Sequence, residues 1–336
     1  MTKAWQPRPF RATPTDLNMP NAEPQTSHDQ GNASRAIEAL DRAVVVAEKG
    51  IIDRPILVAS AADWLAAASG SVRDVRARLD RVMLGDDPEQ GLEALLASGA
   101  LDVLLPEVKK LVGFGDGEWR HKDVWKHTKQ VVKQAVPRLE VRWAALLHDV
   151  GKVKTRSISP AGEVHFFGHA EVGARMFERL NRRLPLFAGE PALMETVRFL
   201  ILHHLRANQY EEDWTDSAVR RFAREMGEHL VDLLCLSRAD ITTKRPEKKK
   251  RGLAQISELQ SRITKLAELD AVVPPLPSGI GDSIMKAFGL PPSRLIGDLK
   301  RALEAAVEAN EIAPHLEAEA YVQFLSENRA RFGLPV

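Results

Sequence analysis

Residues 143–152 read W-A-A-L-L-H-D-V-G-K. An apolar run that ends in the adjacent His148 and Asp149 is typical of a buried helix whose last turn presents polar side chains to the protein interior. Gly151 follows at a position where glycine commonly ends a helix. We therefore predict that this segment brings an imidazole and a carboxylate, two common metal ligands, to one point in the core.

Ligand-type side chains also occur on four other predicted segments, at His127, His169, His203, His204 and Asp240. His127 shares a helical face with Val124 and Val131, where a single histidine is more often a core residue hydrogen-bonded to a carbonyl group. Asp240 shares its face with Leu236, so its carboxylate is expected to point inward. A buried carboxylate needs a partner, and a cation is the natural one.

The pair His203 and His204 ends an apolar segment, as the first pair does. His169 follows Gly168, where the backbone can turn sharply. Six imidazole or carboxylate groups that converge on one core are unfavourable unless a metal organises them, so we predict one or two divalent ions. Such mixed ligands suit Mg, Mn, Ni, Co, Fe or Zn, and the spacing does not choose among these ions or between His203 and His204.

The composition favours an all-α protein with no extended basic surface. Of the 336 residues, 44% are hydrophobic and 6% aromatic, proportions that favour helix over sheet. Lys and Arg (47) balance Asp and Glu (46), so nucleic-acid binding would have to come from a local patch. The single Cys235 excludes an intrachain disulfide, and no apolar window is long enough to span a membrane. We expect a cytoplasmic protein that does not interact with membranes.

Composition and periodicity divide the chain into four regions. Residues 1–35 are rich in proline and polar residues and are predicted to be a disordered leader. Residues 36–113 show helical periodicity, residues 114–250 contain the histidine-rich region, and residues 251–336 form a predicted helical tail. The only segment that suggests a strand is 164–167, after a turn.

A basic run, K-R-P-E-K-K-K-R, follows the last candidate ligand. With six Lys or Arg and one Glu it carries five net positive charges, six minus one. The favoured interpretation is a solvated linker between helices, and contacts with RNA phosphates are the alternative. The candidate contacts are Lys244, Arg245, Lys248, Lys249, Lys250 and Arg251.

The order of the ligand-type residues, H, H-D, H, H-H, D, resembles that of the HD phosphohydrolase superfamily. Three segments are similar to the HD-containing C-terminal half of bacterial tRNA nucleotidyltransferases, the CCA-adding and poly(A) polymerase-like enzymes. They are H-K-D-V-W-K-H-T (121–128), L-L-H-D-V-G-K-V-K-T-R (146–156) and G-E-V-H-F-F-G-H-A-E-V-G-A-R (162–175). The likeness extends over about 71–314, with a neck-like segment before the HD domain and a tail after it. It implies an HD-domain helical bundle with flanking N-terminal and C-terminal helical segments.

The catalytic head of that family is a mixed α/β domain with a Gly-Gly turn and two carboxylates on a strand. Residues 69–74, S-G-S-V-R-D, superficially resemble its signature, but no Asp-x-Asp strand follows and the segment fits the start of a helix better. The preceding residues are too few for such a domain. We therefore expect this chain to lack the head and not to add nucleotides to RNA.

For the remaining regions the resemblance implies a metal-dependent phosphohydrolase that acts on phosphomonoesters, 2′,3′-cyclic phosphodiesters or nucleotides, including RNA ends, through a metal-activated water. Four residues match the first metal site of the superfamily: His127, His148, Asp149 and Asp240. His169, with His203 or His204, matches the second site found in its binuclear members.

Three candidate catalytic residues lie together: His148, Asp149 and Lys152. Asp149 is the candidate shared ligand, because a carboxylate can bridge two ions and an imidazole cannot. Lys152 could contact a phosphate oxygen, or it could act as a cation that caps the helix. Arg206 is a weaker candidate for a phosphate contact, and a solvated surface arginine is the favoured interpretation there.

Two alternatives to an enzyme remain at this stage. The chain could be an RNA-binding or tRNA-binding module that acts beside a separate catalytic partner, or the metal could be purely structural. Structural sites are usually closed by four ligands, which disfavours the second alternative. The same ligand order also serves diiron oxygenases, which the tRNA nucleotidyltransferase-like flanks disfavour. The sequence gives neither the physiological substrate nor the oligomeric state.

Overall fold

The structure, a computed structural model, describes residues 27–50, 55–114, 123–271, 274–309 and 311–334. Helices make up nearly all of its regular structure, and among these residues a two-stranded hairpin is the only sheet. The predicted all-α class is therefore confirmed. Most of the predicted leader lies outside the described residues, and the first helix begins inside it, at Ser27.

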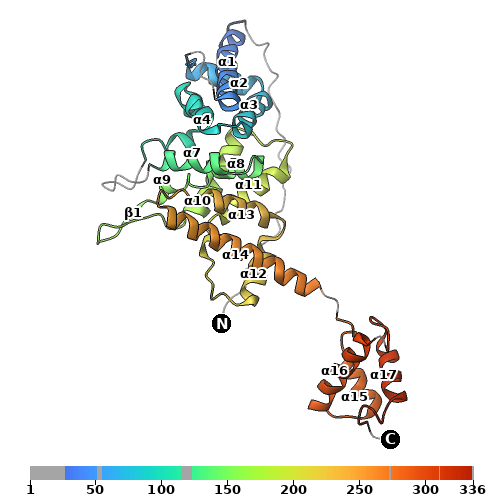
Figure 1. Cartoon of the computed structure of the whole chain (residues 1–336). Coiled ribbons are helices and arrows are strands. Elements are labelled where there is room, and N and C mark those ends of the chain that lie inside the picture. Colours follow the sequence, from blue (N-terminus) through green and yellow to red (C-terminus); the bar gives the residue numbers. More distant parts are fainter. Residues whose placement is uncertain (1–26, 51–54, 115–122, 272–273, 310, 335–336) are drawn as a thin grey trace, which may run out of the picture. The chain divides into compact units, whose positions relative to one another are not determined.

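The chain divides into two compact units. Unit 1 comprises residues 1–214 and 222–259, and unit 2 comprises residues 215–221 and 260–336. Unit 1 holds the N-terminal helices and the histidine-rich region (Figure 1). Its helices are α1 (Ser27–Lys49), α2 (Ala61–Gly70), α3 (Val72–Leu84), α4 (Pro88–Ala97), α5 (Ala100–Val103), α6 (Pro106–Lys109), α7 (Val124–Gln134), α8 (Leu139–Leu147), α9 (Lys152–Thr155), α10 (His169–Arg183), α11 (Pro191–His203), η1 (Ala207–Gln209), η2 (Gly227–His229) and α13 (Leu230–Ala239). Two further helices, α12 (Asp216–Met226) and α14 (Pro246–Ala271), contribute residues to both units.

Serine caps fix the beginnings of α2 and α3. Ser60 Oγ accepts a hydrogen bond from the Asp63 amide at 3.2 Å, and Asp63 accepts one from the Ser60 amide at 2.7 Å, which forms a capping box. Ser71 Oγ accepts from the Asp74 amide at 3.1 Å. Residues 69–74 are therefore a junction between two helices, as the sequence predicts, and not a phosphate-binding turn between strands.

A buried arginine connects α3 with the histidine-rich region. Asp80 Oδ1 accepts hydrogen bonds from Arg76 Nε at 2.6 Å and from Trp143 Nε1 on α8 at 2.7 Å. Arg76 also donates to the carbonyl of Leu186 at 2.9 Å, and its guanidinium lies 4.2 Å from the centre of the Phe187 ring. These contacts satisfy a charge that is only 4% exposed.

A second buried arginine, on α8, also connects this region with α3. Arg142 on α8 donates to the carbonyl groups of Met83 and Gly85, at the end of α3, and to that of Ala135. Carbonyl groups at a helix C-terminus have no partner within the helix, so a cation at that position stabilises α3. The neck-like helix α3 and the helix that precedes His148 are thus held together by two arginines.

The hairpin follows α9 and leads into α10. Strands β1 (Ser157–Ile158) and β2 (Val164–His165) pair antiparallel, with Ser157 opposite His165 and Ile158 opposite Val164. The strand suggested at 164–167 is present as its first two residues. Gly168 then adopts φ 71°, a left-handed conformation that glycine tolerates, and α10 begins at His169.

The basic run is not a linker, contrary to the favoured interpretation of the sequence. Residues from Pro246 onward form the first two turns of α14, and most of them are exposed. Proline at the first helical position and Glu247 in the first turn both favour a helix start. The helix therefore begins inside the run: Lys244 and Arg245 precede it, and the other four cations lie on α14.

Unit 2 has a core of its own, formed by α15 (Ile280–Phe288), α16 (Arg294–Glu308) and α17 (Ala318–Glu327). Leu303, Ile284 and Tyr321 are fully buried there, and the Tyr321 hydroxyl lies 2.8 Å from the carbonyl of Pro275. Two ion pairs join the parts of α12 and α14 that belong to this unit: Arg220–Asp270 at 2.7 Å and Arg262–Asp216 at 2.8 Å. Across both units, no helix in the described part of the chain is long and apolar enough to cross a membrane.

Candidate metal centre

The ligand-type residues lie at the ends of four helices of unit 1 and within a fifth. Helix α8 ends at Leu147, so His148 is its cap and Asp149 lies in the turn that follows. His169 begins α10, His204 caps the end of α11, and Asp240 caps the end of α13. Only His127 comes from within a helix, α7. Each helix is fixed in place by its packing, and the side chains at its end extend beyond the last turn. Ligand-type residues from distant parts of the chain can therefore converge at one point.

The first group consists of His127, His148, Asp149 and Asp240. The Nε2 atoms of His127 and His148 are 3.3 Å apart. Asp240 Oδ1 lies 3.1 Å from His127 Nε2 and 3.6 Å from His148 Nε2. Asp149 Oδ2 lies 3.3 Å from His148 Nε2 and 3.6 Å from His127 Nε2. His127, His148 and Asp149 are thus close enough together to hold one cation, and Asp240 lies within 3.6 Å of both imidazoles.

The second group consists of Asp149, His169 and His204. The Nε2 atoms of the two histidines are 3.2 Å apart. Asp149 Oδ1 lies 3.5 Å from His169 Nε2 and 4.0 Å from His204 Nε2. All three side chains are buried. Asp149 therefore belongs to both groups, with one carboxylate oxygen directed to each.

Hydrogen bonds to backbone carbonyl groups orient three of the histidines. The Nδ1 atoms of His148, His169 and His204 each lie 2.8 Å from a backbone carbonyl oxygen, those of Ala145, Phe166 and Ile201. A carbonyl can only accept, so Nδ1 carries a proton in each ring, and whenever the ring is neutral Nε2 presents its lone pair to the centre. Lone pairs only 3.2 Å apart repel unless a proton or a cation lies between them. The donor set therefore fits a divalent metal.

The electrostatics of the first group demand positive charge. Burial alone would lower the pKa of His148, but the adjacent carboxylates of Asp149 and Asp240 outweigh it and raise the pKa to about 10. Burial opposes it, but the charge and hydrogen bond of His148 hold the pKa of Asp149 well below the usual range, and hydrogen bonds from His127 and His148 do the same for Asp240. In the second group, burial and the charge of His148 lower the pKa of His204 to about 4. A cation bound between the two carboxylates would supply the same compensation as the proton on His148.

Lys152 lies at the edge of this cluster. Its ammonium group donates to Asp149 Oδ2 at 2.6 Å and lies 5.6 Å from the centre of the Phe166 ring. The side chain is 22% exposed, so the cation is open to solvent on one side. Lys152 is the first residue of the short helix α9, whose single turn also contains Lys154.

Close packing of two glycines brings His169 next to Asp149. A Cβ atom on Gly151 would lie 2.0 Å from the carbonyl oxygen of His169 and 2.8 Å from the amide of Gly173. The φ of Gly151 is −66°, which any residue adopts. Glycine is therefore required here by the approach of α10, and not by a left-handed helix end as the sequence suggested.

One known family matches the segment that contains both groups of candidate ligands. The family model of the HD domain matches residues 124–244. This segment is an HD domain. It spans every candidate metal ligand, from His127 to Asp240.

Curated relatives extend the similarity beyond the HD domain. The chain is 33% identical over 261 residues to an A-adding tRNA nucleotidyltransferase of Deinococcus radiodurans, which covers 75% of this chain and 58% of that protein. It is 32% identical over 257 residues to a CC-adding tRNA nucleotidyltransferase of Thermus thermophilus, over 74% and 56% of the two chains. A multifunctional CCA protein of Pseudomonas fluorescens is 34% identical over 111 residues, 31% of this chain and 26% of that protein. The chain thus matches a little over half the length of the first two relatives, and the resemblance to the HD-containing region of this family is confirmed.

Some predicted site residues lie apart from the two ligand groups of the HD domain. The ring of His203 packs on Phe199 at 4.3 Å, and burial lowers its pKa. His204, one residue later, is the histidine that faces Asp149. Arg206 pairs with Glu225 at 2.6 Å and is a partly exposed surface arginine, as the favoured interpretation has it. The assignment of individual ligands stays a prediction.

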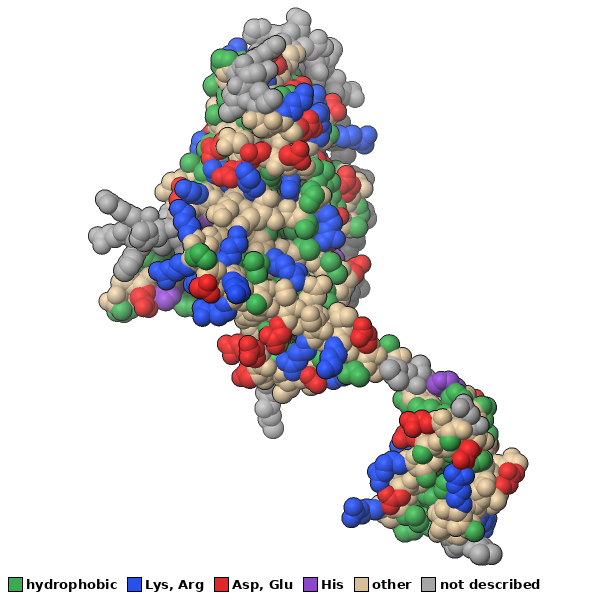
Figure 2. All heavy atoms as spheres, viewed as in Figure 1, with side chains coloured by type: hydrophobic (Ala, Val, Ile, Leu, Met, Phe, Trp, Pro, Cys, Tyr) green, Lys and Arg blue, Asp and Glu red, His purple; other side chains and the backbone are tan. Residues whose placement is uncertain are grey.

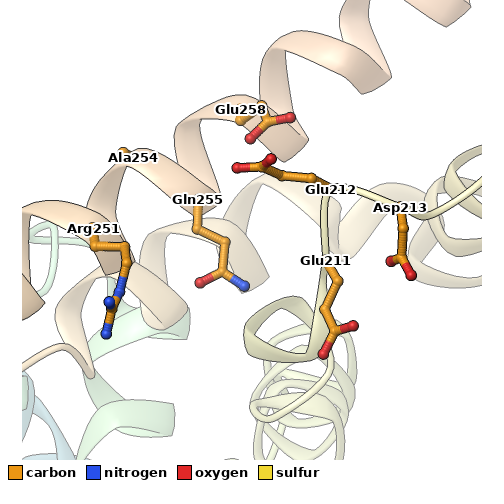
Figure 3. Close-up of a pocket in the computed structure, with 7 residues that line it drawn as sticks. All are labelled: Glu211, Glu212, Asp213, Arg251, Ala254, Gln255 and Glu258. Carbon is orange, nitrogen blue, oxygen red and sulfur yellow. The ribbon is translucent and has the colours of Figure 1, made fainter.

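Most of the basic run lies on α14, partly beside acidic side chains. A surface hollow is lined by Arg251, Ala254, Gln255 and Glu258 of α14 and by Glu211, Glu212 and Asp213 of the segment after η1 (Figure 3). The hollow contains none of the candidate ligands. Lys249 hydrogen-bonds to Gln134 at 3.1 Å, whereas Lys248 and Lys250 are exposed. Lys244, Arg245 and Arg251 are exposed as well, so five of the six cations of the run are open to solvent.

Sequence reasoning missed one residue that supports the cluster. Thr242 Oγ1 lies 2.8 Å from His127 Nδ1, so it orients the ring whose Nε2 faces the two carboxylates. Thr242 follows Asp240 by two residues, and a hydroxyl residue so close to a ligand could have been considered. The carbonyl groups that orient the other histidines carry no signal in the sequence, because every residue has one.

Proposed function

We propose that the HD domain of this chain is a metal-dependent phosphohydrolase, acting on phosphomonoesters, 2′,3′-cyclic phosphodiesters or nucleotides. The observation that carries this proposal is the position of Asp149, whose two oxygens face two separate groups of imidazoles. A carboxylate shared in this way is the arrangement that a pair of divalent ions requires. When bound, one or two such ions would lower the pKa of a water molecule and polarise a phosphoryl group.

The side chains of this chain have distinct roles in that proposal. His127, His148, Asp149 and Asp240 would hold one ion, and Asp149, His169 and His204 a second. The carbonyl groups of Ala145, Phe166 and Ile201 keep the imidazoles in the tautomer that binds metal. Lys152, held at Asp149 and partly open to solvent, would neutralise a phosphoryl oxygen as negative charge develops on it.

The test combines metal content with hydrolysis. Purified protein would be measured by elemental analysis and assayed against p-nitrophenyl esters, 2′,3′-cyclic nucleotides and nucleoside phosphates. We expect Asp149→Asn to lose metal and turnover while it keeps its helical circular dichroism. Lys152→Met is the matched variant: it should retain metal but lower kcat/KM about tenfold or more, since hydrogen bonds to charged groups contribute about 1.5–3 kcal/mol. Equal turnover by wild type and Asp149→Asn would sink the proposal.

RNA binding is a second candidate function. The relatives named as tRNA nucleotidyltransferases and the exposed lysines of α14 support it. In this case the double variant Lys248→Glu/Lys250→Glu should weaken binding of a tRNA and reduce the slope of log affinity against log salt concentration, by about 1 for each lost phosphate contact. Asp149→Asn should bind RNA as wild type does. No binding at low salt would remove this candidate.

A further inference from the structure

The hairpin that precedes His169 carries an exposed aromatic pair. His165 and Phe167 are two residues apart, and their rings are stacked, with centroids 4.9 Å apart and an angle of 14° between the ring planes. Phe167 is 76% exposed, more than any other large hydrophobic side chain among the described residues. One face of its ring is covered by the imidazole, and the rest of the ring is open to solvent.

The same segment is attached to the candidate metal centre. The carbonyl of Phe166 accepts the hydrogen bond from His169 Nδ1 at 2.8 Å, and the Phe166 ring lies 5.6 Å from the ammonium group of Lys152. Phe166 also contacts Phe114, with centroids 6.2 Å apart. The inner phenylalanine is therefore part of the support of the centre. Phe167 follows it and lies two residues before His169, so the Cα atoms of Phe167 and His169 are at most about 7.6 Å apart.

We propose that Phe167, backed by His165, is a stacking platform for the nucleobase of a substrate whose phosphoester lies at the metal centre. This inference rests on the proposed function and names its substrate class. A ribose places the base of a nucleotide several ångströms from its phosphate, and any base offers a π face to an aromatic ring. An exposed ring two residues from His169 lies within that range of the candidate metal centre along the chain.

Positive charges on and after α9 would also favour a nucleotide. Lys152, Lys154 and Arg156 lie on α9 and directly after it, and the last two are exposed. Figure 2 shows Lys and Arg side chains gathered over the part of unit 1 where α9, the hairpin and the start of α14 lie in Figure 1. Cations beside an exposed aromatic ring are the combination that binds single nucleotides and single-stranded RNA. The base could belong to a free nucleotide or to the end of an RNA.

The hairpin itself provides a matched control. Ile158 is 60% exposed and pairs with Val164, whereas Ser157 pairs with His165. Residues directly opposite one another lie on the same face of a hairpin, and successive residues alternate between faces. Ile158 therefore lies on the face opposite His165, and Ile158→Ala removes exposed apolar surface without touching the stacked pair.

The test compares substrates with and without a base. Wild type, Phe167→Ala, Phe167→Trp and Ile158→Ala would be assayed with adenosine 2′,3′-cyclic phosphate, with glycerol 1,2-cyclic phosphate, and with a short RNA that ends in a 2′,3′-cyclic phosphate. We expect Phe167→Ala to raise KM for the base-containing substrates at least fivefold, roughly the lower end of what one base–aromatic stack contributes. Its kcat and its activity on the glycerol ester should not change. Phe167→Trp and Ile158→Ala should behave as wild type.

A binding measurement separates this inference from the proposed function. Titration of the same proteins with adenosine monophosphate in a calorimeter needs no turnover, so absence of hydrolysis in wild type would refute only the proposed function. Weaker binding by Phe167→Ala, restored in Phe167→Trp, would support the platform even then. Unchanged KM and affinity in Phe167→Ala would overturn it, as would an equal loss on the glycerol ester. An effect on RNA alone would identify the RNA end as the source of the base, and an effect on both would show that a free nucleotide suffices.

Discussion

His203 and His204 are adjacent in the chain, yet only His204 faces Asp149. We expect His204→Ala to reduce the bound metal and to lower hydrolysis at least tenfold, because it removes a buried nitrogen of the second group. His203→Ala should keep both, since that ring packs on Phe199 outside the two groups. Elemental analysis of the two purified variants, followed by assays with the phosphate esters named above, checks this expectation. Equal metal content in both variants would contradict the assignment.

Helical periodicity contained the answer to this choice. Val197, Ile201 and His204 are related by steps of four and three residues, so they share one helical face, and the two apolar residues are buried. His203 is four residues from Phe199 and lies on another face. The candidate ligand types and their order can thus be read from the sequence, and helical periodicity favours His204 over His203 as the histidine that faces Asp149.

At the scale of elements, the close approach of α10 to the turn after α8 rests on Gly151. We expect Gly151→Ala to lower the free energy of unfolding by about 1–3 kcal/mol or more, because the added methyl group overlaps the backbone of His169. It should also reduce metal content, since α10 carries His169. Gly70→Ala is the matched control in the same unit: nothing lies within 4 Å of its added Cβ, so stability should be unchanged within about 0.5 kcal/mol. Denaturant unfolding of both variants measures their free energies of unfolding. Equal stability of the two variants would refute the packing argument.

Such contacts between elements explain why the sequence predicts ligands better than it predicts their supports. Gly151 appeared as a helix stop because local patterns report only on neighbours in the chain. Its actual constraint comes from the backbone of His169, which only the packed structure brings near. The same holds for the basic run: its charge suggested a linker, although Pro246 and Glu247 are residues typical of a helix start.

At the scale of the whole molecule, every candidate ligand belongs to unit 1, while α15–α17 enclose a separate core. We therefore expect a chain that ends at Ala271 to retain its metal content and its hydrolysis of small esters within about twofold. The shortened chain keeps α12 and all of α14, including the ion pairs that join them. Metal analysis and kinetics of this truncated protein test the expectation. Loss of metal on truncation would show that the C-terminal helices support the centre.

The two arginines that join α3 to α8 also bear on how much of the chain the HD domain needs in order to fold. The family match begins at residue 124, but Arg76 and Asp80 lie before it. Arg76 is buried with its guanidinium over the Phe187 ring, and Asp80 accepts a hydrogen bond from Trp143. A gene fragment cut at the family boundary would leave the indole nitrogen of Trp143 without its acceptor and the α8 arginine without the end of α3. We therefore expect the smallest fragment that folds stably to include α3 as well as the matched residues, so the boundary of the family match is not the boundary of the folding unit.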